Sequence, residues 1–209
     1  LMLAGSGLAS FDLMVKLELL DHLMPDVARA VAEAPDSPGA RLLRLGLENT
    51  DERVRADKSV TPTFLFAVLL WPAILRAAGA PLGPLPDDPQ LLGTACDEVL
   101  GRQLRRITIP KRFGLPMRDL IMLQPRFERR SGRRALRLLE HPKFRAAYDL
   151  LLLRAASGEI DPEIAAWWTR LQELPEAERI AEVEGRPAEA GETTRRRRPR
   201  RRRKRPAAE

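Results

Sequence analysis

Residues 61–75 read TPTFLFAVLLWPAIL and contain the longest apolar run of the chain. Thr61 and Pro62 are typical of a helix start, because the missing N–H of proline is tolerated in the first turn. Large apolar side chains then recur at helical spacing: Phe64, Leu65, Val68, Leu69 and Ile74. We therefore expect a buried helix, kinked or ended in its regular part at Pro72. The run is shorter than the roughly 18 residues that a membrane-crossing helix needs.

Helical periodicity also dominates the sequence on both sides of this run, and strand patterns are almost absent. On the C-terminal side, the Gly- and Pro-rich residues 79–89 predict a loop. On the N-terminal side, Asp36-Ser37-Pro38 is typical of a helix start. Before it, apolar residues at steps of three and four predict one helix face: Leu13, Leu17, Leu20, Met24 and Val27.

Beyond the loop, helices are expected over residues 91–109, 113–130 and 133–139, with a disturbance at Pro125. Asp161-Pro162 begins a last helix. Before that start lies one more buried helical stripe: Phe144, Tyr148, Leu151 and Ala155. Counting the periodic segments predicts an all-α fold of about seven to nine helices over residues 8–174.

Large apolar residues become rare after Pro175, so too little surface can be buried to offset the entropy of ordering the chain. We expect disorder from about residue 176 onward. The predicted architecture is a helical body followed by a disordered basic C-terminal tail. Changes in composition divide it into residues 1–90, an arginine-rich helical region over residues 91–174, and a linker with an arginine-rich tail over residues 175–209.

The net charge of +7 is distributed unevenly along the chain. Residues 1–101 hold 8 basic and 14 acidic residues, residues 102–145 hold 14 basic and 3 acidic, and residues 146–194 hold 4 basic and 11 acidic. Residues 195–209 add ten Arg or Lys and one Glu. Two separate cationic blocks result, and they indicate a polyanionic partner.

The first cationic block has the pattern of a phosphate-binding helical surface. Over residues 113–130, apolar side chains gather on one side of the helix and arginines fall roughly opposite. Only Asp119 and Glu128 oppose this charge between residues 102 and 137, whereas an ordinary solvated face, the alternative reading, usually mixes both signs. The candidate RNA-binding residues here are Arg105, Arg106, Lys111, Arg112, Arg118, Arg126, Arg129, Arg130, Arg133 and Arg134.

The second cationic block is the tail, with ten cations among residues 195–205. Such a segment attracts RNA, DNA or acidic protein alike, because it releases counterions without fixing geometry. We expect it to act as a sequence-blind tether, while the helical arginines position the strand. Its candidate residues are Arg195, Arg196, Arg197, Arg198, Arg200, Arg201, Arg202, Arg203, Lys204 and Arg205.

Catalytic motifs are missing from the sequence. Gly5-Ser6-Gly7, the one dense glycine cluster, lies between helical stretches and predicts a turn rather than a phosphate-binding loop. The chain has no Asp-x-Asp pair to hold metal ions, and the side chains of the adjacent Asp87 and Asp88 diverge. We therefore expect no catalytic residue, no metal ligand and no cofactor in this chain.

Other residues with chemical potential are better explained by structure. Cys96 lies in an apolar stretch and is expected to be a buried small hydrophobe. As the only cysteine it excludes a disulfide within the chain and favours a reducing cytoplasm. His22 and His141 have no metal-ligand spacing to it. Trp167 and Trp168 cannot both face one ligand from neighbouring helix positions, so both are expected to be structural.

Four segments resemble the body of the bacterial poly(A) polymerase I family. They are residues 47–53 (LENTDER), residues 60–67 (VTPTFLFA) followed by Trp71, residues 109–112 (IPKR) and residues 138–151 (LLEHPKFRAAYDLL). An arginine-rich tail in this position also fits the family. The resemblance covers nearly the whole chain.

This resemblance implies that residues 1–90 form an RNA-binding neck and body, and that body and tail hold RNA. In the family, a separate catalytic head with ATP and Mg²⁺ adds AMP to RNA 3′ ends, and its paired aspartates are absent here. We therefore expect the chain to be an excerpt of a longer cytoplasmic protein, without a membrane segment and inactive alone. Three alternatives stay open: a freestanding nucleic-acid-binding adaptor, the C-terminal part of a CCA-adding tRNA nucleotidyltransferase, and a scaffold whose tail binds acidic proteins.

Overall fold

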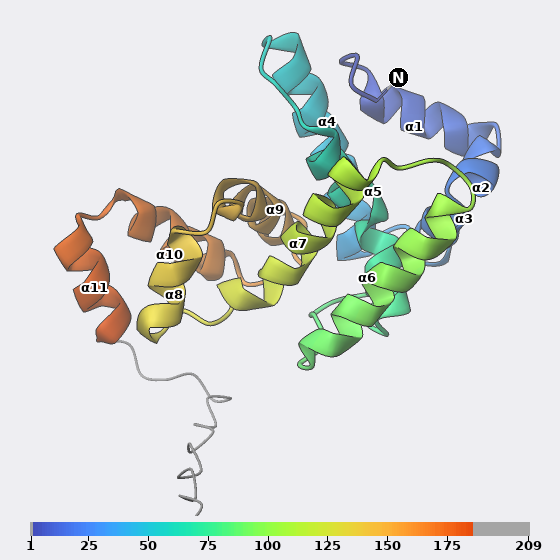
Figure 1. Ribbon diagram of the computed structural model, residues 1–209. Helices are drawn as coiled ribbons and strands as arrows, with labels where there is room; N and C mark the ends of the chain where they lie inside the picture. Colours follow the sequence, from blue (N-terminus) through green and yellow to red (C-terminus); the bar gives the residue numbers. More distant parts are fainter. Residues whose placement is uncertain (1, 186–209) are drawn as a thin grey trace, which may run out of the picture.

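The computed structural model describes residues 2–185, and within them every regular element is a helix. The all-α fold is thereby confirmed. Figure 1 shows α4, α5, α7 and α9 between one end formed by α1–α3 and α6 and another formed by α8, α10 and α11. The helices are α1 Gly7–Lys16, α2 Leu19–Leu23, α3 Pro25–Glu33, α4 Pro38–Arg55, α5 Pro62–Ala77, α6 Pro89–Leu104, α7 Lys111–Phe127, α8 Gly132–Leu139, α9 Phe144–Ala156, α10 Pro162–Glu173 and α11 Glu176–Glu184.

Helix α5 is the centre of the fold, as its apolar sequence predicts. It packs against α3, α4, α6, α7 and α9, and every residue from 67 to 75 is buried. The Thr61 hydroxyl accepts a hydrogen bond from the Phe64 N–H at 3.4 Å and so caps the helix start. Of the two effects expected at Pro72, a kink or an end of the regular helix, the end is excluded, because the helix continues through this buried proline to Ala77. Packing on all sides holds the helix together where local propensity would break it.

The single helix face predicted from Leu13 to Val27 is divided among three helices. Glu18 has a φ of 59°, in the left-handed region, and turns the chain between α1 and α2. Leu13 and Leu17 are consequently 54% and 55% exposed, whereas Leu20, Met24 and Val27 are buried as expected. The spacing of these apolar residues fits one face of a continuous helix, but the chain turns at Glu18 and forms separate helices instead.

Two further helix ends and the number of helices differ from the expectations. Helix α6 ends at Leu104 rather than near residue 109. Helix α7 keeps helical geometry across both Pro116 and Pro125 and ends at Phe127 rather than near residue 130. Ten of the described helices, instead of seven to nine, end before residue 174, because the segment expected as one N-terminal helix forms three.

Disorder from residue 176 onward was wrong for the first nine residues, which form α11. This helix packs against α8 and buries Val183 completely. The Trp167 indole N–H also donates to the Glu182 carboxylate at 2.7 Å. One buried valine and one indole contact anchor a segment whose composition alone is typical of disorder. The predicted disorder of residues 186–209 lies outside the described residues.

One continuous hydrophobic core runs through the described residues and includes side chains from both sides of the boundary predicted at residue 90. Cys96 is fully buried, as expected, and burial raises the pKa of its thiol to about 12. Trp167 and Trp168 are also buried, which confirms their structural role. The Trp168 indole N–H donates to the Phe127 carbonyl at 2.8 Å and thereby joins α10 to the end of α7.

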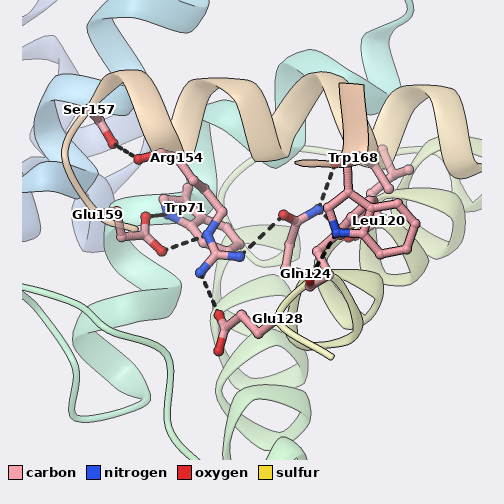
Figure 2. A network of polar contacts seen from close by, with 10 residues as sticks. Trp71, Leu120, Gln124, Glu128, Arg154, Ser157, Glu159 and Trp168 are labelled. Carbon is pink, nitrogen blue, oxygen red and sulfur yellow. Dashed lines mark hydrogen bonds and ion pairs between the residues drawn. The ribbon is translucent and has the colours of Figure 1, made fainter. Parts of the chain in front are cut away.

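Arg154 ties three of the central helices together from inside the core (Figure 2). Its fully buried guanidinium donates to Glu159 at 2.8 Å, to Gln124 of α7 at 3.4 Å and to Glu128, the residue directly after α7, at 3.1 Å. The second Glu159 oxygen accepts the indole N–H of Trp71 in α5 at 2.6 Å. A charge can be buried when each donor has a partner, so this network fixes α5, α7 and α9 relative to one another.

Candidate nucleic-acid interface

The structure separates most of the helical candidate cations into two groups, one at each end of α7. The first group follows α6 or begins α7, and all four residues are exposed: Arg105, Arg106, Lys111 and Arg112. The second group lies at the end of α7 and the start of α8: Arg126, Arg129, Arg130, Arg133 and Arg134. At a rise of 1.5 Å per residue, Lys111 and Arg126 are about 22 Å apart along the helix.

Exposure differs within the second group. Arg126, Arg129, Arg133 and Arg134 are exposed, whereas Arg130 is half-buried. The charge of Arg130 contributes to a lowered pKa at Glu163 of α10, although the hydrogen bond from Arg170 is the larger cause. Arg130 thus faces the neighbouring helix as well as solvent.

Arg118 differs from the other helical candidates because it forms a bidentate ion pair. Its guanidinium contacts the two Asp97 carboxylate oxygens of α6 at 2.5 and 2.8 Å. These hydrogen bonds raise the pKa of Arg118 and lower the pKa of Asp97. Arg118 therefore joins α6 to α7, and a phosphate at this position would have to compete with Asp97.

The two acidic residues that interrupt the first cationic block are both compensated. Asp119 pairs with Lys143, and Glu128 pairs with the buried Arg154 at 3.1 Å. The partners of both carboxylates are thus residues outside the candidate RNA-binding set. The ten candidate cations of residues 195–205 lie outside the described residues.

A groove of about 770 Å³ lies between the two groups of cations. The end of α4 and the start of α5 form one wall, from Asn49 and Arg53 to Phe64. Helix α9 forms another wall along almost its whole length, from Arg145 to Ala156, and Pro116 and Leu120 of α7 complete the lining. Segments far apart in the sequence thus meet at one concave surface.

Gly46 allows α4 to pack closely against α5 and α9. A Cβ built on Gly46 of α4 would lie 2.5 Å from a Val68 methyl of α5 and 3.2 Å from a Leu153 methyl of α9. No other residue type could occupy this crossing without displacing a neighbour. Gly46 precedes Asn49 and Thr50 by one helical turn, so this close contact positions the end of α4 at the groove.

Three cations line the groove together with two carboxylates. Arg53 donates to the Ser59 carbonyl at 3.1 Å, and Arg145 forms an ion pair with Asp149 at 3.2 Å. Burial raises the pKa of Asp149, and the charges of Arg145 and Arg53 act in the opposite direction. Lys143 pairs with Asp119 beside the groove, and Glu52 is the other lining carboxylate.

Arg53, Lys143 and Arg145 were absent from the residues proposed from charge density. Arg53 lies outside both cationic blocks, directly after Asp51 and Glu52. Lys143 and Arg145 lie at the very end of the block of residues 102–145, beyond the arginines chosen as candidates. A different signal was available, because residues 47–53, 60–67 and 138–151 carry the family resemblance and all three segments line the groove. Their exposed polar residues are the part of that resemblance that packing does not explain.

The described residues offer no metal centre. They bring together no group of three or more His, Cys, Asp or Glu side chains that could hold an ion. The described residues therefore do not fit the Mg²⁺ ion that the family resemblance assigns to its catalytic head. In the same part of the chain, no helix is both long enough and apolar enough to cross a membrane.

Residues 88–204 match the family described as the polymerase A arginine-rich C-terminus, and the chain belongs to this family. The chain is similar to proteins named Poly(A) polymerase I. It is 40% identical to that of Escherichia coli O157:H7 and 38% to that of Salmonella typhi over 178 residues, and 33% to that of Haemophilus influenzae over 179 residues. Each match covers 82% of this chain and 38% of the relative. The resemblance seen in the sequence is thereby confirmed.

Proposed function

We propose that this chain is the RNA-holding part of a polynucleotide adenylyltransferase, which adds AMP from ATP to RNA 3′ ends in the cytoplasm. The family membership and the similarity to Poly(A) polymerase I support the reaction class. ATP and Mg²⁺ are assigned to a catalytic head outside these 209 residues, because the described residues do not fit a metal ion.

The observation that carries this proposal is the distribution of cations on α7 and its neighbours. Residues 102–145 hold 14 basic and 3 acidic residues, and two of these acids already pair with Lys143 and Arg154. Arg112 near the start of α7 and Arg126, Arg129 and Arg133 at and beyond its end are exposed, so a polyanion can reach them. Cations on fixed helices can contact successive phosphates and so set the direction of a strand.

RNA affinity measured against salt concentration tests the proposal on the full chain. One variant carries Gln at the ten cationic positions of residues 195–205, and a second adds Arg129→Gln and Arg133→Gln. We expect the first to bind more weakly, with residual salt-dependent binding. The second should lose more affinity, and its slope of log affinity against log salt should fall by about 0.7 for each phosphate contact removed.

A matched control removes two exposed cations from a distant surface. Lys16→Gln with Arg29→Gln, on α1 and α3, lowers the net charge by the same amount. If this pair weakens binding as much as the change at Arg129 and Arg133, net charge alone explains the affinity and the helical surface does not position RNA.

A further inference from the structure

We propose that the groove between α4, α5, α7 and α9 binds a short segment of single-stranded RNA, with bases on its apolar floor and phosphates at its cationic walls. The proposal rests on the proposed function. It names a site whose cations are not among the candidate RNA-binding residues found in the sequence. Its strand would pass between the two groups of cations at the ends of α7.

The size of the groove is right for nucleotides. Its volume of about 770 Å³ falls within the roughly 300–1,000 Å³ of typical ligand sites. Paired bases are stacked inside a duplex and cannot enter such a groove, whereas a single strand can place its bases there. The shape therefore favours a single strand over a duplex.

The floor offers apolar and aromatic surface to a base. Phe64 is half-buried and packs on the core, which leaves part of its surface to the groove. Pro116 of α7 and Leu152 of α9 add to this surface, whereas Leu120 is only 2% exposed and lies beneath it. Every base has a flat apolar face, so stacking on such a floor depends little on sequence.

The walls offer positively charged groups that are already positioned. The Ser59 carbonyl holds Arg53 on the α4 wall. Across the groove, the Arg145 guanidinium lies 5.7 Å from the Tyr148 ring and pairs with Asp149. Held cations lose less conformational freedom on binding phosphate than free ones. A single strand can turn its phosphates to one side and its bases to the other, so it can place phosphates at the cationic walls and bases on the apolar floor.

Beyond the groove, one side of α7 leads toward the first group of cations. Arg112 precedes Pro116 by one helical turn, and Pro116 precedes Leu120 by one turn, so the three lie along one side of α7. Arg112 is exposed and does not line the groove itself. A strand leaving the groove at this end meets further cations.

Asp149 allows a test in which the direction of the change is informative, because its carboxylate pairs with Arg145 and repels phosphate. Asp149→Asn keeps the size of the side chain and removes the charge. An RNA site predicts tighter binding in this variant, whereas a site that uses Asp149 to hold a basic peptide predicts weaker binding of that peptide and no change for RNA.

The experiment measures binding of a fluorescent oligoadenylate of about 15 nucleotides to the full chain with the ten tail cations changed to Gln. In this background we expect Arg53→Gln with Arg145→Gln to weaken binding about tenfold, and Asp149→Asn to strengthen it about threefold. Phe64→Leu should weaken binding of the single strand about fivefold, but leave binding of the corresponding duplex unchanged. Helical content and unfolding midpoints verify that each variant folds.

The outcomes separate the groove from the proposed function. If the groove variants bind the oligoadenylate like their parent while Arg129→Gln with Arg133→Gln binds more weakly, the groove proposal is overturned and the RNA-holding function stands. If neither the chain with its native tail nor any of the variants binds RNA, the proposed function itself fails. Groove-dependent binding of an acidic peptide in place of RNA would also overturn the groove proposal, in favour of a protein partner.

Discussion

Arg154 shows how much one buried charge depends on its partners. Its side chain and that of Glu159 are both 0% exposed, and Trp71 and Gln124 complete the network. A substitution that removes one member leaves the others buried with unsatisfied charges or hydrogen bonds. The network therefore favours the one packing arrangement in which all of its members are paired.

We expect Arg154→Leu to lower the free energy of unfolding by about 3–5 kcal/mol, because Glu159 would remain buried without its cation. Urea denaturation measures this loss. Arg170→Leu is the matched control, since it breaks an exposed pair with Glu163 that solvent screens, and it should cost much less than Arg154→Leu. Equal losses in the two variants would show that the Arg154 network has no special role.

The raised pKa of Asp149 predicts a pH dependence with a definite sign. Burial makes the folded protein hold this proton to higher pH than the unfolded chain does, so ionisation costs stability. The cost is absent below the unfolded pKa and complete above the folded pKa. Asp149→Asn should therefore gain stability relative to the parent as pH rises through the carboxyl range. Urea denaturation at several pH values measures the difference, and a gain that shrinks with rising pH would be the contrary result.

Cys96 should be inert in the folded protein. Its thiol is fully buried and its pKa is raised to about 12, so the reactive thiolate is scarce at neutral pH. A chromogenic thiol reagent should react with the unfolded chain in urea and only slowly without denaturant. Rapid reaction of the folded chain would contradict the packing around α6.

At the scale of helices, the crossing of α4 with α5 decides where the groove lies. Gly46→Ala should destabilise the protein by about 1–3 kcal/mol, because the added methyl overlaps Val68. Gly101→Ala in α6 is the control with the opposite sign. No atom lies within 4 Å of its built Cβ, so it should stabilise by about 0.5–1 kcal/mol through helix propensity. Thermal denaturation of both variants measures the contrast, and a stable Gly46→Ala variant would refute the close crossing.

The sequence predicted helices where apolar spacing was long and uninterrupted. This applies to α5 and to α9, whose residues Phe144, Tyr148 and Leu151 are all buried. It failed at Glu18, where a single left-handed residue ended one helix and redirected the chain. It failed again at α11, which is stabilised by contacts with α8 and Trp167 that no local pattern contains.

The candidate interface was predictable only where charges are adjacent in the sequence. Exposure of Arg129 and Arg133 agrees with a surface role, but the ion pair of Arg118 with Asp97 joins residues 21 positions apart. The groove could not be predicted from the sequence, because α4, α5, α7 and α9 each contribute only part of its lining. Its residues become a set only when the Gly46 crossing and the Arg154 network bring these helices together.

At the scale of the whole molecule, the proposed function assigns the holding of RNA to this chain and the addition of adenylates to a separate catalytic head. We expect the purified chain to incorporate no labelled AMP into RNA in the presence of ATP and Mg²⁺. The reason is that its sequence contains no Asp-x-Asp pair, and its described residues gather no metal-binding cluster. Incorporation above the level of a protein-free control would contradict this division.

The central claim is that the folded helices, and not only the arginine-rich tail, hold RNA. Photo-crosslinking of a 4-thiouridine-containing single-stranded RNA to the full chain, followed by mapping of the modified peptides, tests this claim most directly. We predict crosslinks in two regions: around Arg129 and Arg133 at the end of α7, and on the groove walls near Phe64 and Arg145. Crosslinks confined to residues 195–205 would contradict the claim and leave the cations of α7 and α8 as an ordinary solvated surface.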